Sequence, residues 1–127
     1  MAPRIAVLGC GYWGSNHIRT LKKLGVLHAV SDANGARAEG FASEQECLAI
    51  APEELHLRDD VDAVVLALPP QYHAEFAERL VKAGKDVLVE KPIALTVADA
   101  ERIVAAAREN HRVFMVGHVL RFHPAFE

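Results

Sequence analysis

The sequence has few cysteines and no excess of positive charge. Its 127 residues include only two cysteines, Cys10 and Cys47, which form neither a C-x-x-C pair nor a zinc-type spacing. This scarcity argues against a disulfide framework and favours the reducing cytoplasm. Fourteen Lys and Arg residues against seventeen Asp and Glu residues give a net charge of -3. That balance offers no electrostatic footprint for nucleic acid or an anionic membrane, so neither is an expected partner.

Long hydrophobic runs and metal-ligand clusters are also missing. No apolar run approaches the roughly eighteen residues of a membrane span, and the apolar stretch near the N-terminus is too short for a signal peptide. His118 and His123, which follow the last predicted strand, have no cysteine nearby and no acidic cluster, so we predict no metal site. There are no internal repeats and no Pro/Ser-rich linker. With 51% apolar residues, the chain is expected to form one domain, residues 1–127, around a real core.

Short apolar segments alternate with amphipathic ones along the whole chain. The predicted strands cover residues 4–8, 26–30, 61–68, 86–90 and 112–117. The predicted helices cover residues 12–24, 34–42, 71–83 and 97–110. Residues 43–57 give a poor signal, apart from a short helical start at 52–55. This alternation predicts an α/β fold: a doubly wound parallel sheet with helices on both faces.

The first predicted strand runs directly into a glycine-rich turn, Gly9-x-Gly11-x-x-Gly14. In a dinucleotide site, Gly9 would make the tight turn and Gly11 would let a pyrophosphate approach the backbone. Gly14 would let the following helix pack closely on the strand. The free N–H groups and positive dipole end of that helix would hold the phosphates. Three glycines in six residues also occur in ordinary loops, so the motif needs support from the rest of the chain.

Asp32 supplies that support, because it lies 18 residues beyond Gly14 at the end of the second predicted strand. An acidic side chain there accepts hydrogen bonds from the adenosine ribose, and its charge repels a 2′-phosphate. The cofactor predicted is therefore NAD, with NADP less favoured. The alternative is that Asp32 is only a turn residue. Arg37 would suit a 2′-phosphate, although an exposed helix arginine is the simpler interpretation.

Leu68-Pro69-Pro70 ends the next apolar strand at its carboxyl edge, where open α/β sheets bind ligands. We expect Leu68 and Pro69 to form a wall of the cofactor site, with a plain strand terminator as the alternative. His73 follows at the start of a helix. A lone histidine there is more often a surface or capping residue, but its place in the motif makes it a candidate cofactor contact.

Glu90-Lys91-Pro92 places two opposite charges where another apolar strand ends. A lysine at this edge would exchange protons or donate a hydrogen bond to a substrate hydroxyl or carbonyl beside a nicotinamide. A surface ion pair at a loop is the competing interpretation.

Polar and aromatic residues near the first and last strands complete the candidates. His118 and Arg121 follow the last predicted strand and suit an anionic or polyhydroxylated substrate. Trp13 is expected to pack against neighbouring residues, with stacking on the cofactor as the alternative. His17 and His28 are interpreted as structural.

Together these motifs resemble the N-terminal dinucleotide-binding (Rossmann) domain of the Gfo/Idh/MocA oxidoreductases, a family named for glucose–fructose oxidoreductase and inositol dehydrogenase. The resemblance rests on Gly9-Cys-Gly-Tyr-Trp-Gly14, Asp32, Leu68-Pro-Pro-Gln-Tyr-His73, Gly84-Lys-Asp86 and Glu90-Lys91-Pro92. It implies reversible hydride transfer between NAD(P) and a hydroxyl of a sugar, nucleotide sugar or polyol.

The same resemblance implies roles for individual residues. Lys91 matches the family's active-site lysine, Glu90 the residue near the nicotinamide ribose, and Tyr12 and Trp13 part of the cofactor loop. It also implies a cis Lys91-Pro92 peptide, and places His118 and Arg121 where the cofactor and substrate sites meet.

The resemblance also implies a second, substrate-binding α/β domain, which this chain lacks. The family's Asp and His of that domain do not occur before the chain stops at Glu127. We therefore expect a fragment that is inactive alone, from a protein that forms a homo-oligomer.

Two other functions remain open on the sequence. One is a non-catalytic module that senses NAD. The other is a Rossmann domain for S-adenosylmethionine or a coenzyme A ester, against which Asp32 and Glu90-Lys91-Pro92 argue.

Overall fold

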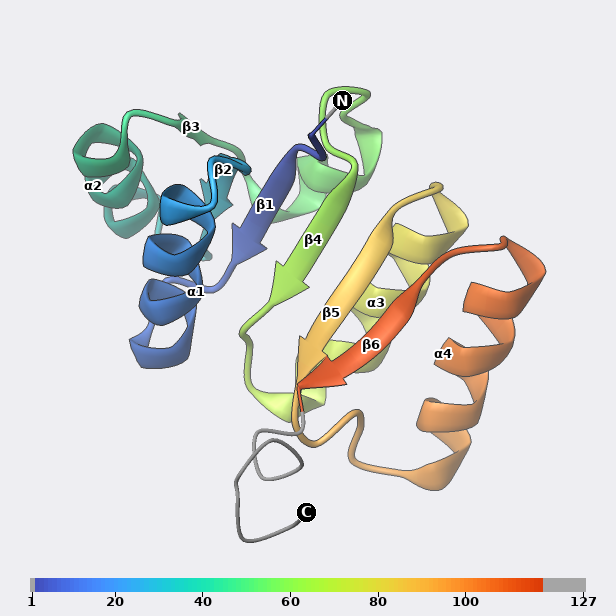
Figure 1. Cartoon of the computed structure of the whole chain (residues 1–127). Coiled ribbons are helices and arrows are strands. Elements are labelled where there is room, and N and C mark those ends of the chain that lie inside the picture. The colour runs from blue at the N-terminus through green and yellow to red at the C-terminus, as the bar shows by residue number, and fades with distance from the viewer. Residues whose placement is uncertain (1, 118–127) are drawn as a thin grey trace, which may run out of the picture.

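A computed structural model of the chain describes residues 2–117. In chain order its elements are β1 (Ile5–Leu8), α1 (Tyr12–Lys23), β2 (Leu27–Ser31), α2 (Gly35–Gln45), β3 (Leu48–Ala49), η1 (Pro52–Leu57), β4 (Ala63–Leu66), η2 (Pro70–Tyr72), α3 (His73–Lys82), β5 (Asp86–Glu90), α4 (Val97–Glu109) and β6 (Phe114–Gly117). The η elements are 3-10 turns. Figure 1 shows strands and helices alternating along the chain, as the sequence predicts.

The strands form one parallel sheet in the order β3-β2-β1-β4-β5-β6. The order reverses between β1 and β4, which pair in parallel with Val7 opposite Val65. This is the strand order of a Rossmann fold, whose ligand crevice lies at the carboxyl ends of the strands at the point of reversal. The predicted doubly wound parallel sheet is therefore confirmed.

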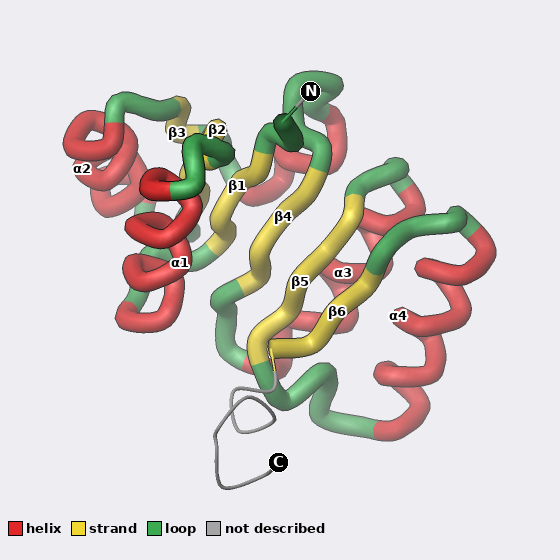
Figure 2. Tube along the Cα trace, viewed as in Figure 1, coloured by secondary structure: helices red, strands yellow, loops and turns green. Residues whose placement is uncertain are grey.

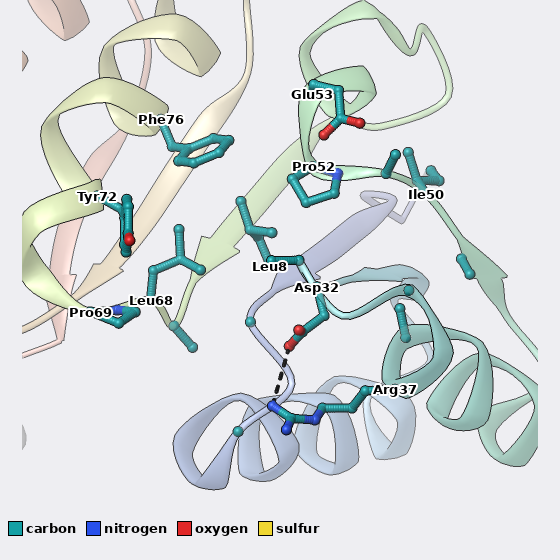
Figure 3. A pocket seen from close by; sticks show the side chains of 18 of the residues that line it. Leu8, Asp32, Arg37, Ile50, Pro52, Glu53, Leu68, Pro69, Tyr72 and Phe76 are labelled. Carbon is teal, nitrogen blue, oxygen red and sulfur yellow. Dashed lines mark ion pairs between the residues drawn. The ribbon is translucent and has the colours of Figure 1, made fainter.

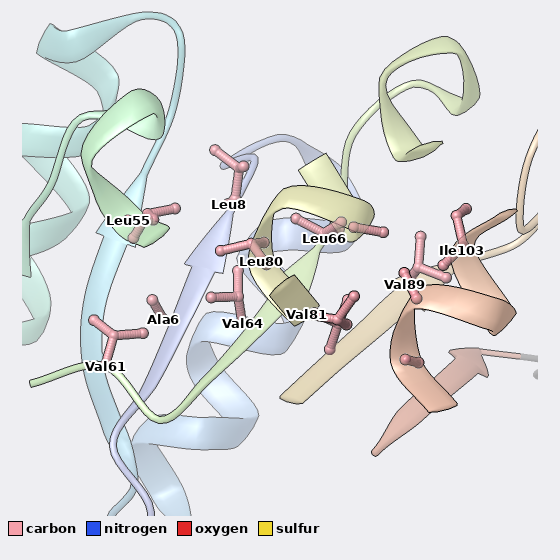
Figure 4. Close-up of a cluster of buried hydrophobic side chains, with 14 of the residues drawn as sticks. Ala6, Leu8, Leu55, Val61, Val64, Leu66, Leu80, Val81, Val89 and Ile103 are labelled. Carbon is pink, nitrogen blue, oxygen red and sulfur yellow. The ribbon is translucent and has the colours of Figure 1, made fainter. Parts of the chain in front are cut away.

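Two apolar clusters fill the space between the sheet and its helices. On one face, Val7, Val30 and Val65 of the strands pack with Ile18 of α1 and the alanines of α2. On the other face, the strands pack against η1, α3 and α4. The largest side chains of that cluster are Leu8, Leu55, Leu66, Leu80 and Ile103, seen in Figure 4. Figure 2 shows the helices divided between the two sides of the sheet. Burial on both faces explains why the strands read as continuous apolar runs.

Some predicted boundaries are wrong, for identifiable reasons. The strand predicted at 61–68 is limited to Ala63–Leu66, and the helix predicted from residue 71 opens with the 3-10 turn Pro70–Tyr72. The strand β3 was missed because two exposed residues carry no periodicity. The helix predicted at 12–24 ends at Lys23, and Leu24 is its C-cap residue and is 67% exposed.

No helix within residues 2–117 has both the length and the apolar character needed to cross a membrane.

Candidate functional site

The glycine loop joins β1 to α1 at the carboxyl edge of the sheet. Gly9 has a φ of +104°, and a Cβ there would overlap the backbone carbonyl of Ala67 at the end of β4. A Cβ on Gly14 would overlap the carbonyl oxygen of Gly9, so Gly14 lets the helix lie against the loop. A Cβ on Gly11, by contrast, would meet no atom within 4 Å. Gly9 and Gly14 are thus required by the fold, whereas Gly11 faces open space.

The first turn of α1 faces that open space without a capping side chain. Gly11 is the N-cap residue, it makes no side-chain cap, and the first turn holds no acidic residue. The last turn carries Lys22 and Lys23, which complement the negative end of the helix dipole. The amides of the first turn, which have no partner within a helix, are therefore available to an anion.

Asp32 ties the glycine loop to the end of β2. One carboxylate oxygen, Oδ2, accepts a hydrogen bond from the Cys10 N–H at 2.7 Å, and Oδ1 accepts one from the Asn34 N–H at 2.8 Å. Arg37 lies 3.9 Å from Oδ2, and the Asp32 side chain is only 12% exposed. Burial, helped by the charge of Asp32, raises the pKa of the Cys10 thiol to about 11. The carboxylate is thus held firmly beside the loop.

A cavity of about 860 Å³ opens at this edge of the sheet. Figure 3 shows Asp32 and Arg37 on one side of it and Leu68 and Pro69 on the other. Gly9, Gly11, Ile50, Pro52, Glu53, Tyr72 and Phe76 complete most of its wall. Its volume is in the range of small-molecule and cofactor sites, and its lining is mostly apolar with a few polar groups, as in such sites.

The other predicted residues lie outside this cavity. Tyr12 and Trp13 are 76% and 52% exposed on the first turn of α1, with ring centroids 5.3 Å apart in an edge-to-face arrangement. Gly14, Glu90 and Lys91 do not line the cavity either. His118 and Arg121 lie outside the described residues.

His73 is fully buried, not a surface residue. Its Nδ1 lies 2.8 Å from the Pro92 carbonyl oxygen and its Nε2 lies 2.8 Å from the Leu68 carbonyl oxygen. Both partners are backbone carbonyl oxygens, which accept hydrogen bonds from ring N–H groups. The side chain thus joins the loop after β4 to the loop after β5, and nothing of it reaches the cavity.

Lys91 follows the carboxyl end of β5 and is exposed. The Lys91-Pro92 peptide bond is cis, as the resemblance implied. Within residues 2–117, the Lys91 side chain makes no hydrogen bond and no ion pair, so the competing interpretation, a surface ion pair with Glu90, does not hold. The Glu90 carboxylate instead contacts Nε2 of His17 on α1.

Several contacts at this edge were not predicted from the sequence. Ile50, Pro52 and Glu53 line the cavity but come from the segment with a poor signal. Phe76 also lines the cavity and comes from the helix predicted at 71–83, which was not linked to a ligand. The partners of His17 and His73 follow from tertiary packing, since no spacing in the sequence marks them.

The amino-terminal edge of the sheet carries a separate set of ion pairs. Arg58 and His28 both contact Asp60, at 2.7 Å each, and their hydrogen bonds hold the pKa of that carboxyl well below its usual range. Arg4 pairs with Asp62 at 3.1 Å and lowers the pKa of Asp62 to about 2. In the part of the chain that the structure describes, no group of three His, Cys, Asp or Glu residues is arranged to hold a metal.

The sequence and the fold match known proteins. A sequence model of the family described as "Oxidoreductase family, NAD-binding Rossmann fold" (GFO_IDH_MocA) matches residues 3–118. Inositol 2-dehydrogenase 2 of Saccharopolyspora erythraea is 42% identical over 99% of this chain and 39% of its own length.

Two solved structures are similar over nearly the whole chain. The UDP-N-acetylglucosamine 3-dehydrogenase of Acidithiobacillus ferrooxidans superposes with a TM-score of 0.91 at 34% identity, covering 99% of this chain and 42% of that one. A 3-ketoreductase from Actinomadura kijaniata, in complex with NADP and TDP-benzene, gives a TM-score of 0.88 at 32% identity, covering 98% and 39%.

This chain therefore spans about two fifths of the length of these similar proteins. All three are named as dehydrogenases or reductases, which agrees with the oxidoreductase reading and gives no support to a regulatory module. The family match, the strand order and the glycine loop at the point of reversal agree with one another. The chain belongs to the Gfo/Idh/MocA oxidoreductase family and forms its NAD(P)-binding Rossmann domain.

Proposed function

We propose that this chain is the cofactor-binding part of a dehydrogenase that transfers hydride between a nicotinamide cofactor and a hydroxyl of a sugar, nucleotide sugar or polyol. The observation that carries the proposal is the exposed Lys91, which pairs with no group among residues 2–117 and lies at the same sheet edge as the glycine loop and the cavity. The names of the similar proteins, which include an inositol dehydrogenase and a UDP-N-acetylglucosamine dehydrogenase, support the substrate class.

The residues at this edge fit a dinucleotide. The cavity of about 860 Å³ is of the right size, the space over Gly11 is open, and the first turn of α1 is uncapped. Gly9, Gly11 and Gly14 would shape the pyrophosphate site, with Tyr12 and Trp13 on the helix turn beside it. Asp32 would accept hydrogen bonds from the adenosine ribose. Leu68 and Pro69 would form the apolar wall opposite Asp32.

The cofactor proposed is NAD, with NADP less favoured. The Asp32 carboxylate is held in place at the cavity by two backbone N–H groups, so it cannot easily turn away from a 2′-phosphate. Arg37 would favour NADP, because its guanidinium lies at the cavity beside Asp32, where it could pair with a 2′-phosphate. The similar 3-ketoreductase was solved with NADP, so the choice needs direct measurement.

Lys91 is the proposed catalytic residue at the nicotinamide end. When bound, the nicotinamide accepts or donates the hydride. Lys91 would donate a hydrogen bond to the reacting oxygen of the substrate and help carry its proton. Glu90 would lie near the nicotinamide ribose, His73 would support the cofactor loops, and His118 and Arg121 would contact the substrate.

The test uses the complete protein that contains this chain. It is mixed with NAD or NADP and with myo-inositol, simple sugars or UDP-N-acetylglucosamine, and the absorbance of the reduced nicotinamide is followed. Substrate-dependent reduction, faster with NAD, is expected. Tight NAD binding without reduction by any substrate of these three classes would contradict the proposal. We further propose that this protein acts in the cytoplasm as a homo-oligomer, which fractionation and sedimentation would test.

A further inference from the structure

The residues before and after Lys91 in the sequence each contact a histidine, and the two histidines belong to two different helices. His17, on α1, contacts the Glu90 carboxylate before it. His73, at the start of α3, lies against the Pro92 carbonyl after it, with a nitrogen–oxygen distance of 2.8 Å. These helices lie on opposite faces of the sheet, since α1 packs in one core cluster and α3 in the other. The segment bearing Lys91 is therefore fixed from both faces.

The contact of Glu90 follows from strand geometry. Side chains two residues apart in a strand point to the same face, and Leu88 packs against the cluster that includes α1. Glu90 consequently points toward α1, where it meets His17. Opposite Glu90 in β6 stands Gly117, and a Cβ at that position would come within 3.3 Å of a Glu90 carboxylate oxygen. Gly117 thus leaves room in β6 for the Glu90 carboxylate, whose contact is His17.

The contact of His73 is made inside the protein. The ring is fully buried and links Leu68, after β4, to Pro92, after β5. The two loops that border the nicotinamide end of the site in our proposal are thereby fixed to each other. Hydrogen bonds between buried polar groups make a structure rigid, so the two contacts of His73 hold the loops after β4 and β5 in place relative to each other.

Lys91 itself makes no bond that would hold it among residues 2–117. Its position therefore depends on its two neighbours. We propose that His17 and His73 are positioning residues that fix the Lys91 segment and keep the Glu90 carboxylate from pairing with the Lys91 ammonium, an inference that rests on the proposed function of Lys91. Neither histidine lines the cavity, so each acts through the residue next to Lys91 that it contacts.

The first test measures hydrogen exchange and does not need turnover. In the complete protein, His17→Ala should speed exchange of the backbone amides in residues 88–95 by roughly tenfold, the effect of losing one hydrogen bond to a charged group. His17→Gln keeps a donor at similar reach and should restore protection. The matched control is His28→Ala, which removes a similar contact, to Asp60 at 2.7 Å, at the opposite edge of the sheet. It should leave residues 88–95 unchanged.

His73 is tested without mutation. With selective isotope labelling of histidine, NMR should find that a ring N–H proton of His73 exchanges slowly with solvent, as expected of a buried donor held by a backbone carbonyl. Rapid exchange of every ring N–H proton of His73 would overturn the role of His73. Unchanged exchange of residues 88–95 in His17→Ala would overturn the role of His17.

Kinetics then separate positioning from a general structural role. His17→Ala should lower kcat by roughly tenfold to a hundredfold, as small misplacements of a reacting group do, with little change in the NAD dissociation constant. In a Lys91→Ala background it should cause no further loss; an equal loss there would overturn the inference. Faster exchange in His17→Ala, together with no turnover in the unmodified protein, would contradict the proposed function while supporting the positioning.

Discussion

Alanine substitutions at Gly11 and Gly14 should affect different properties, NAD affinity and stability respectively, although both glycines belong to one motif. Gly14→Ala puts a Cβ onto the carbonyl oxygen of Gly9, and a backbone atom cannot move aside as a side chain can. Overpacking typically costs about 1–3 kcal/mol and sometimes more. The gain in helix propensity from Gly to Ala is at most about 1 kcal/mol, so it does not offset this overlap. We expect Gly14→Ala to lose about 2 kcal/mol or more of folding free energy.

Gly11→Ala should leave the fold intact and weaken cofactor binding. Gly11 has a φ of -77°, which alanine adopts freely, and its Cβ would meet no protein atom. The poorer N-cap and the lower entropy of the unfolded chain each change stability by about 0.5–1 kcal/mol in opposite directions, so they nearly cancel. The new methyl group would stand where the pyrophosphate approaches. The overlap of the methyl group with the pyrophosphate should cost about 1–3 kcal/mol of binding free energy. The NAD dissociation constant should therefore rise roughly five- to 150-fold.

The assay is calorimetric titration with NAD, combined with denaturant unfolding of the complete protein. Gly14→Ala should lose folding stability, whereas Gly11→Ala should lose affinity for NAD. Normal NAD affinity in Gly11→Ala would refute the placement of the pyrophosphate over Gly11.

Three further predictions concern charge and protonation. Asp32→Ala should shift the ratio of NAD to NADP affinity toward NADP by roughly tenfold, about 1.4 kcal/mol, because it removes a like charge from the 2′-phosphate site; an unchanged ratio in paired titrations would argue against the ribose role. The Cys10 thiol, whose pKa is raised to about 11 by burial, should be alkylated far more slowly at about pH 8 in the folded protein than after denaturation; rapid alkylation of the native protein would contradict its burial. The pKa of Asp62 is lowered from 3.8 to about 2, first by its hydrogen bond with Arg4, so its stabilising effect is complete above pH 3.8 and is lost as the pH falls to about 2. As the pH falls from 3.8 to about 2, Asp62→Asn should therefore lose less stability than the unmodified protein. Asp59, whose side chain makes no bond among residues 2–117, provides the control, and Asp59→Asn should behave as the unmodified protein does.

The sheet could be predicted from the sequence because its strands are buried on both faces. Val7, Val65 and their neighbours form apolar runs, and glycines or prolines mark where the runs end. The strand β3 carries no comparable pattern, and the helical start predicted at 52–55, which matches η1, was not linked to a ligand, so the wall formed by Ile50 and Pro52 was missed.

The candidate site was predictable only where a local motif marks it. The glycine loop and Asp32 are recognised by their spacing, and the structure places Gly9, Gly11 and Asp32 around one cavity. The partners of His17 and His73 lie 73 and 19 residues away, for Glu90 and Pro92, and become neighbours only after β5 has joined the sheet. No local pattern carries that information.

The most direct test of the account is Lys91→Ala in the complete protein, with Lys82→Ala on the exposed side of α3 as its control. Substrate oxidation and NAD binding are measured on the same preparations. Turnover should fall roughly a hundredfold or more in Lys91→Ala, with the NAD dissociation constant within about twofold of normal, and neither should change in Lys82→Ala. Turnover in Lys91→Ala equal to that of the unmodified protein would contradict the placement of the reaction at the carboxyl end of β5.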